Sequence, residues 1–175
     1  MTTWTAPEIT DRREPGPTGG ERKQLEAWLD YHRKTLLTKC AGLTGEQLAT
    51  ASVPPSNLTL IGLVRHMAEV ERSWFRTRFR GQETGTIWIT KDQPDAEFEN
   101  ANAASAQEDY ATFLREVELA RAAISDRDLD DTYHNQFFDA PMDLRWIVTH
   151  MIEEYARHNG HADLIREQID GATGD

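Results

Sequence analysis

The sequence has almost no cysteine, because Cys40 is the single thiol among 175 residues. One thiol can form neither an intramolecular disulfide nor a zinc cluster of cysteines. A chain without a disulfide framework is typical of a reducing compartment, so we expect a cytoplasmic protein. We expect Cys40 to be inert, since no base is evident beside it in the sequence.

Long apolar runs and an excess of positive charge are also missing. No stretch approaches the roughly 18 apolar residues of a membrane-spanning helix, and the polar, proline-containing residues 1–17 do not resemble a signal peptide. The 30 acidic residues outnumber the 19 basic ones, which gives a formal net charge of −11. This charge repels phosphate backbones, so we expect neither nucleic acid nor a membrane as a partner.

Several catalytic motifs are absent from the sequence. There is no His-Glu-x-x-His, no Gly-x-Ser-x-Gly and no glycine-rich phosphate loop. A di-iron helical bundle needs Glu-x-x-His on each of two helices, whereas the third residue after Glu154 is Arg157.

Apolar residues recur at helical spacing in four long segments. The pattern predicts helices over residues 18–41, from Ser56 or Thr59 to about 80, over 105–125, and from Pro141 to a cap at Gly171. Capping boxes of the form Ser/Thr-x-x-Glu are expected at 18–21 and 105–108. We expect residues 44–50 to form a loose turn, and residues 126–139 to form a loop whose aromatic side chains cap the core.

A long connection, residues 81–104, separates the second and third predicted helices. Within it, residues 86–90 are expected to form a short strand or an ordered loop. A connection of this length indicates that the chain crosses a bundle or builds a binding rim. We predict an all-α four-helix bundle over residues 18–171, with a flexible arm at 1–17 and a frayed end at 172–175.

The fourth predicted helix places a carboxylate and an imidazole beside its apolar stripe. At about 100° per residue, Glu154 and His158 lie on the core side, whereas Glu153 faces solvent. Residues four apart have Cβ atoms about 5–6 Å apart, so the pair can share one metal ion. A third ligand must come from another helix, and His66 is the histidine of the second helix.

Two histidines and one glutamate form a known ligand set of catalytic zinc, with a fourth position open for water or substrate. Nickel, manganese or iron accept the same ligands. Each residue also has a structural interpretation, with His158 as a hydrogen-bonded core histidine and Glu154 as a solvated or ion-paired side chain.

Other polar residues near these positions have two interpretations each. His161 is predicted to orient a metal ligand, or else to lie at the surface. Glu71 falls in the centre of an apolar helix face, which predicts a structural ion pair with an arginine or a ligand-orienting role. We expect His150 to be structural, and His32 and His134 to lie at the surface or in a loop.

Three segments resemble signatures of the DinB-like superfamily. Residues 58–75, LTLIGLVRHMAEVERSWF, resemble its second helix, and residues 150–167, HMIEEYARHNGHADLIRE, resemble its fourth. Residues 30–36, DYHRKTL, match its first helix. The chain looks most like the actinobacterial mini-circle protein branch, which is related to the mycothiol-dependent maleylpyruvate isomerase and the bacillithiol S-transferases.

This resemblance implies an up-down-down-up four-helix bundle that binds a divalent metal, usually zinc or nickel. The matching ligand positions are His66, Glu154 and His158. It also implies a low-molecular-weight thiol such as mycothiol, whose thiolate attacks an electrophile. Several relatives are dimers, so a homodimer is an alternative to a monomer.

We therefore expect a metal-dependent thiol S-transferase whose partners are a small-molecule thiol and an electrophile. Residues 81–104 are expected to shape the electrophile pocket. A metal-dependent hydrolase using metal-bound water, and a non-catalytic metal-containing stress-response or binding module, remain as alternatives. The sequence assigns no catalytic side chain and no thiol-binding residue.

Overall fold

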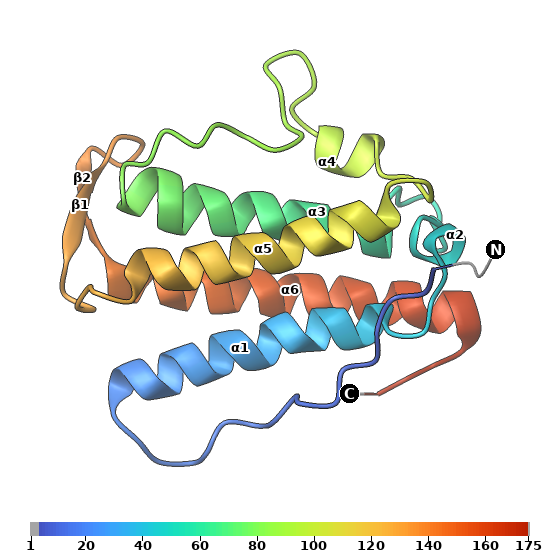
Figure 1. The fold of residues 1–175 in the computed structure, drawn as a ribbon, viewed down its shortest axis with the longest axis horizontal. Helices are drawn as coiled ribbons and strands as arrows, with labels where there is room; N and C mark the ends of the chain where they lie inside the picture. Colours follow the sequence, from blue (N-terminus) through green and yellow to red (C-terminus); the bar gives the residue numbers. More distant parts are fainter. Residues whose placement is uncertain (1–3, 175) are drawn as a thin grey trace.

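The computed structural model describes residues 4–174 and is mostly helical, with one small sheet (Figure 1). The long helical segments are α1 (Glu21–Cys40), α3 (Leu60–Glu71) with its π-helical continuation η1 (Arg72–Phe79), α5 (Ala106–Ile124) and α6 (Leu144–Asp170). The shorter elements are α2 (Gly45–Leu48), α4 (Ala96–Glu99), and the antiparallel strands β1 (Thr132–Asn135) and β2 (Ala140–Asp143). Among the described helices, none has the length and apolar character that crossing a membrane requires. The predicted helical class is therefore confirmed, with the addition of a two-stranded sheet.

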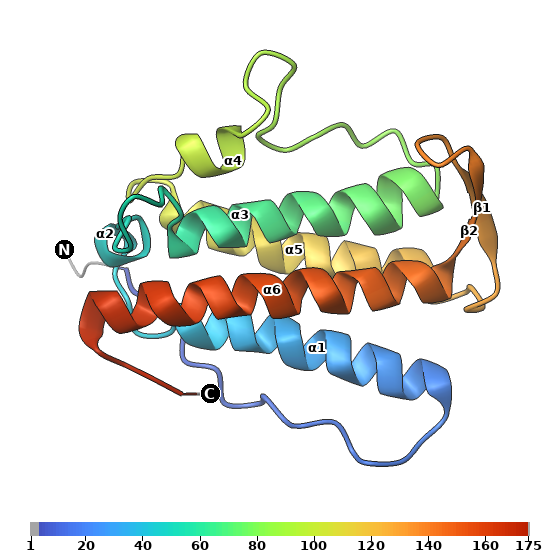
Figure 2. The same cartoon turned by 180° about the vertical axis from the view of Figure 1, so that it is seen from behind.

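The long helices lie side by side along the long axis of the molecule in both views (Figures 1 and 2). Helices α1 and α6 run in one direction, and α3 and α5 run in the other. The connection from η1 to α5 returns along the outside of α3 and contains α4, which is why α3 and α5 share a direction. Fully buried side chains from each long helix form one core, including Leu36, Met67, Phe113 and Met151.

Side-chain caps explain where two of the long helices begin. The Thr59 hydroxyl accepts a hydrogen bond from Gly62 N at 3.0 Å and starts α3, as predicted. The Asp143 carboxylate accepts from Trp146 N at 2.7 Å, so α6 begins at Leu144. The prediction that Pro141 starts this helix is wrong, because residues 140–143 pair with β1 as a strand.

Both predicted capping boxes are also wrong. Gly20 is the N-cap of α1 and has no capping side chain. The Ser105 hydroxyl donates to Asp109 Oδ2 at 2.8 Å and does not cap α5. A full capping box occurs instead at Thr44 and Gln47, and it turns the loose turn predicted there into helix α2.

The loop predicted over residues 126–139 contains β1, and its aromatic tip does not cap the core. Phe137 is 85% exposed and Phe138 is 56% exposed. Residues 86–90 form a loop and no strand.

The amino-terminal segment lies against the helices where it is described. Ala6 N donates to Leu43 O at 2.9 Å, and the Arg12 guanidinium donates to the Tyr31 hydroxyl at 2.8 Å. The predicted domain boundaries and the mobility of 1–17 and 172–175 stay predictions. Residues 1–3 and 175 of these segments lie outside the described part.

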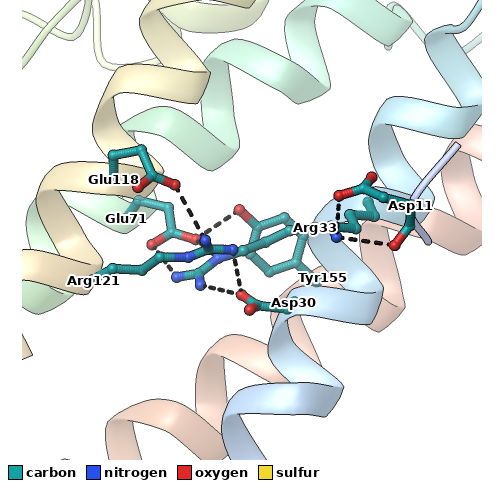
Figure 3. Close-up of polar contacts among 8 residues, drawn as sticks. Asp11, Asp30, Arg33, Glu71, Glu118, Arg121 and Tyr155 are labelled. Carbon is teal, nitrogen blue, oxygen red and sulfur yellow. Dashed lines mark hydrogen bonds and ion pairs between the residues drawn. The ribbon is translucent and has the colours of Figure 1, made fainter. Parts of the chain in front are cut away.

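A buried ion pair joins three helices in the interior (Figure 3). Arg33 of α1 donates from Nε and Nη2 to the two carboxylate oxygens of Glu71, each at 2.7 Å. The Tyr155 hydroxyl of α6 donates to Glu71 Oε1 at 2.7 Å. Asp30 extends the network at 2.9 Å from Arg33 Nη1 and 2.7 Å from Arg121 Nη2 of α5. Glu71 therefore forms the ion pair that its place on an apolar face predicted.

The charges in this network are well defined. Burial lowers the pKa of the Arg33 guanidinium, but the attraction of Glu71 outweighs it and holds this pKa well above its ordinary value. Burial and the negative charge of Glu71 raise the pKa of the Tyr155 hydroxyl well above its usual range. Tyr155 is therefore a permanent donor to the carboxylate.

Replacing Glu71 by glutamine is expected to lower the free energy of unfolding by about 3–5 kcal/mol, because the buried charge of Arg33 loses its partner. Urea denaturation followed by circular dichroism measures the loss. Glu118→Gln is the matched control, since Glu118 meets Arg121 at the surface and its loss is expected to be below about 1 kcal/mol. Equal losses in the two variants would contradict a structural role for the buried pair.

Candidate metal centre

Two helices bring the three predicted ligand residues together. His66 of α3 and Glu154 and His158 of α6 each offer one ligand atom, and these atoms all lie within 4.8 Å of one another. His158 Nε2 lies 3.5 Å from Glu154 Oε2, and the centroids of the two imidazole rings are 4.7 Å apart. The side chains are half-buried, so the group is sheltered but reachable.

Burial and nearby positive groups favour the neutral form of His158. Burial, helped by the nearby His66, His161 and Arg157, lowers the pKa of His158 to about 4. A neutral imidazole is the form that binds a metal ion, because its lone pair is free.

The donor set fits one divalent metal ion. Ligand atoms about 2.0–2.1 Å from a tetrahedral zinc ion are about 3.3 Å from each other. The 3.5 Å between His158 Nε2 and Glu154 Oε2 is close to that separation. Two imidazole nitrogens and one carboxylate oxygen are also a chemically suitable set for zinc, and nickel accepts them as well.

A neighbouring group fits a metal ion less well. His150, Glu153 and Glu154 also converge within 4.8 Å. However, Glu153 is half exposed and forms an ion pair with Arg157, which also lies 3.9 Å from Glu154 Oε1. Arg157 therefore competes with a metal ion chiefly for Glu153, which belongs to the neighbouring group alone. His150 instead stacks on Trp146, with centroids 4.9 Å apart, in agreement with its predicted structural role.

Each histidine of the first group has a partner for its Nδ1 atom. His66 Nδ1 lies 3.3 Å from Glu97 Oε1, and His158 Nδ1 lies 3.4 Å from His161 Nδ1. His161 thus contacts a candidate ligand, and its ligand-orienting role stays a prediction. Glu97, by contrast, was not singled out from the sequence, because the acidic stretch around α4 has no periodicity that marks one residue.

Glu71 and Cys40 do not belong to this group of ligand atoms. Both carboxylate oxygens of Glu71 are used by Arg33, and one of them also by Tyr155, which is the chain neighbour of Glu154. Cys40 is buried, and burial raises the pKa of its thiol to about 12, so it is a poor nucleophile, as predicted.

The two other histidines are placed differently from each other. His134 is exposed and lies in strand β1. His32 is half-buried and lies in α1, where its backbone carbonyl accepts from Asn159 Nδ2 at 3.0 Å. Neither histidine belongs to a convergent group of ligand atoms among residues 4–174.

Buried charges on α3 hold the long connection beside His66. Glu69 Oε1 accepts hydrogen bonds from three successive backbone N–H groups, those of residues 87, 88 and 89, at 2.7, 2.6 and 3.1 Å. Arg65 donates to the carbonyl oxygens of Asn100 and Ala96 at 2.9 and 3.1 Å. Residues before and after His66 on α3 thus hold the connection between η1 and α5 in place.

Fold and site together define a mostly helical protein with a candidate centre for a single metal ion. A family model described as mycothiol S-transferase matches residues 24–171, and the chain belongs to this DinB-like family. The predicted resemblance is therefore confirmed. The fold is also similar to that of a conserved protein of Enterococcus faecalis, with a TM-score of 0.62 and 15% identity, over 89% of this chain and 100% of that one. No curated protein matches the chain.

Glu69→Gln is expected to release the loop at residues 87–89. A charged acceptor contributes about 1.5–3 kcal/mol to a hydrogen bond, so amide exchange there should be faster by about tenfold or more. Hydrogen exchange with mass spectrometry measures the rate. Glu83→Gln, which changes an exposed residue of the same connection, is the control. Unchanged exchange in Glu69→Gln would contradict the anchoring role.

Proposed function

We propose that this protein is a metal-dependent S-transferase that activates mycothiol, or a similar low-molecular-weight thiol, at His66, Glu154 and His158. The observation that carries the proposal is the convergence of these three ligand atoms within 4.8 Å in a chain of the mycothiol S-transferase family. The metal is zinc or nickel. The directions of α1, α3, α5 and α6 support the up-down-down-up bundle that the family resemblance implies.

His66, Glu154 and His158 would hold the divalent ion, which would supply a Lewis acid that lowers the pKa of a thiol and favours its nucleophilic thiolate form. The chain would contribute one carboxylate, Glu154, and the imidazoles of His66 and His158. One negative charge against a doubly charged ion leaves a net positive site, which attracts an anionic sulfur. A fully carboxylate ligand set would lose this attraction.

The family model, described as mycothiol S-transferase, supports the reaction class that we propose. The thiol gives up its proton to solvent, a sulfur–carbon bond forms on the electrophile, and the leaving group departs with the electrons of the broken bond. The connection over residues 81–104, anchored through Arg65 and Glu69, forms a wall beside His66. We propose that this wall contributes to the electrophile pocket.

His158→Ala is expected to abolish metal retention and to lower thiol-dependent conjugation by more than about 100-fold, because it removes a direct ligand. Metal analysis of the purified protein and a conjugation assay with mycothiol and a model electrophile measure the two effects. His134→Ala is the control, since this histidine is exposed in β1. It is expected to retain both metal and activity.

Two results would contradict the proposal. Turnover by the wild-type protein without any thiol would favour a hydrolase. Metal binding with neither activity would favour a non-catalytic module.

A further inference from the structure

We propose that Glu97 is a positioning residue of the metal centre, and this inference rests on the proposed function. Its carboxylate accepts a hydrogen bond from Nδ1 of His66. This contact fixes the tautomer of the ring and directs Nε2 toward Glu154 and His158. Glu97 comes from α4, within the long connection, so the connection supplies part of the metal centre as well as part of its wall.

The contact between Glu97 and His66 is buried and close. Glu97 is 4% exposed, and its Oε1 atom lies 3.3 Å from His66 Nδ1. Its second oxygen, Oε2, is buried and has no hydrogen-bond partner among residues 4–174. Removing a carboxylate from water is costly unless a donor or cation faces it. The hydrogen bond to His66 and the positive charge of Arg65 together account for the position of this carboxylate.

The tautomer follows from elementary acid–base chemistry. A neutral imidazole has one N–H, and a carboxylate can only accept a hydrogen bond. The proton of His66 therefore sits on Nδ1, and the lone pair on Nε2 is free for a metal ion. The Phe98 ring stacks on the same imidazole with centroids 5.0 Å apart and an interplanar angle of 26°, which fixes the plane of the ring. Two successive residues of α4 thus define both the tautomer and the orientation of one ligand.

Fixed charges hold α4 in this place. The Arg65 guanidinium donates to Ala96 O, the carbonyl next to Glu97, and lies over the Trp88 ring at 4.6 Å from its centroid. Its Nη1 atom lies 3.6 Å from Asp109 Oδ2 of α5. Among residues 4–174, His66 is the hydrogen-bonding partner of Glu97, while Arg65 acts on the same carboxylate through its charge.

The test compares zinc affinity in Glu97→Gln and in Glu99→Gln, a matched change on the same short helix. Glu99 is exposed, whereas Glu97 contacts the ligand ring. Competition of the full-length protein with a chromophoric chelator should give about 10- to 100-fold weaker zinc binding for Glu97→Gln and unchanged binding for Glu99→Gln. Equal zinc affinity in wild type and Glu97→Gln would overturn the inference and leave the proposed function intact. A wild-type protein that binds neither zinc nor nickel would overturn both.

A double-mutant cycle separates positioning from a general loss of structure. In a His66→Ala background, Glu97→Gln is expected to cause no further loss of zinc affinity, because its effect passes through the imidazole. Thermal unfolding of the metal-free proteins should be alike for Glu97→Gln and Glu99→Gln. Additive losses of affinity in the cycle would overturn the inference, since a structural defect acts whether or not His66 is present.

Discussion

The geometry of the candidate metal centre depends on the buried pair of Arg33 and Glu71. Arg33 also contacts Asp30, but Glu71 is fully buried, and desolvation makes the loss of its charged partner costly. Tyr155 adds a third fixed contact to the same carboxylate. Tyr155 directly follows Glu154 and lies three residues before His158. The hydrogen bond from Tyr155 to Glu71 therefore also sets the rotation of α6 that presents these two candidate ligands. A shift of one residue along that helix would turn both ligands by about 100° away from His66.

Helix α3 connects this interior network with the outer connection. Its inner face presents Glu71 to the core, and its outer face presents Arg65 and Glu69 to the returning chain. His66 lies between these two sets of contacts. The Arg33–Glu71 pair therefore places the candidate ligands Glu154 and His158 relative to α3. On the outer face, Arg65 and Glu69 hold the connection so that Glu97 contacts His66. Helix α3 therefore links the interior ion pair and the outer connection, which both position the candidate metal centre.

Helical periodicity was sufficient to predict the long helices and the pairing of Glu154 with His158, because both depend on contacts between neighbouring turns. His66 was predicted as the histidine of the second helix, and the bundle brings it to this pair. The hairpin was not predictable in the same way. Pro141 suits the first turn of a helix, but pairing of residues 140–143 with β1 delays the start of α6 until the Asp143 cap. Glu97 was missed for a related reason. Its position depends on Arg65, about thirty residues earlier in the chain, and local sequence does not encode such a contact.

The separation of the two carboxylates has a chemical consequence. Glu154 belongs to the ligand group itself, whereas Glu97 acts from the far side of an imidazole ring. A second carboxylate as a direct ligand would neutralise a divalent ion and weaken its attraction for an anionic sulfur. From behind His66, the negative charge of Glu97 would make the ring a better electron donor to a metal ion and would lie farther from a bound thiolate, and Coulomb repulsion falls with distance. In the proposed centre, this arrangement would strengthen the binding of a metal ion and preserve positive charge where a thiolate would bind.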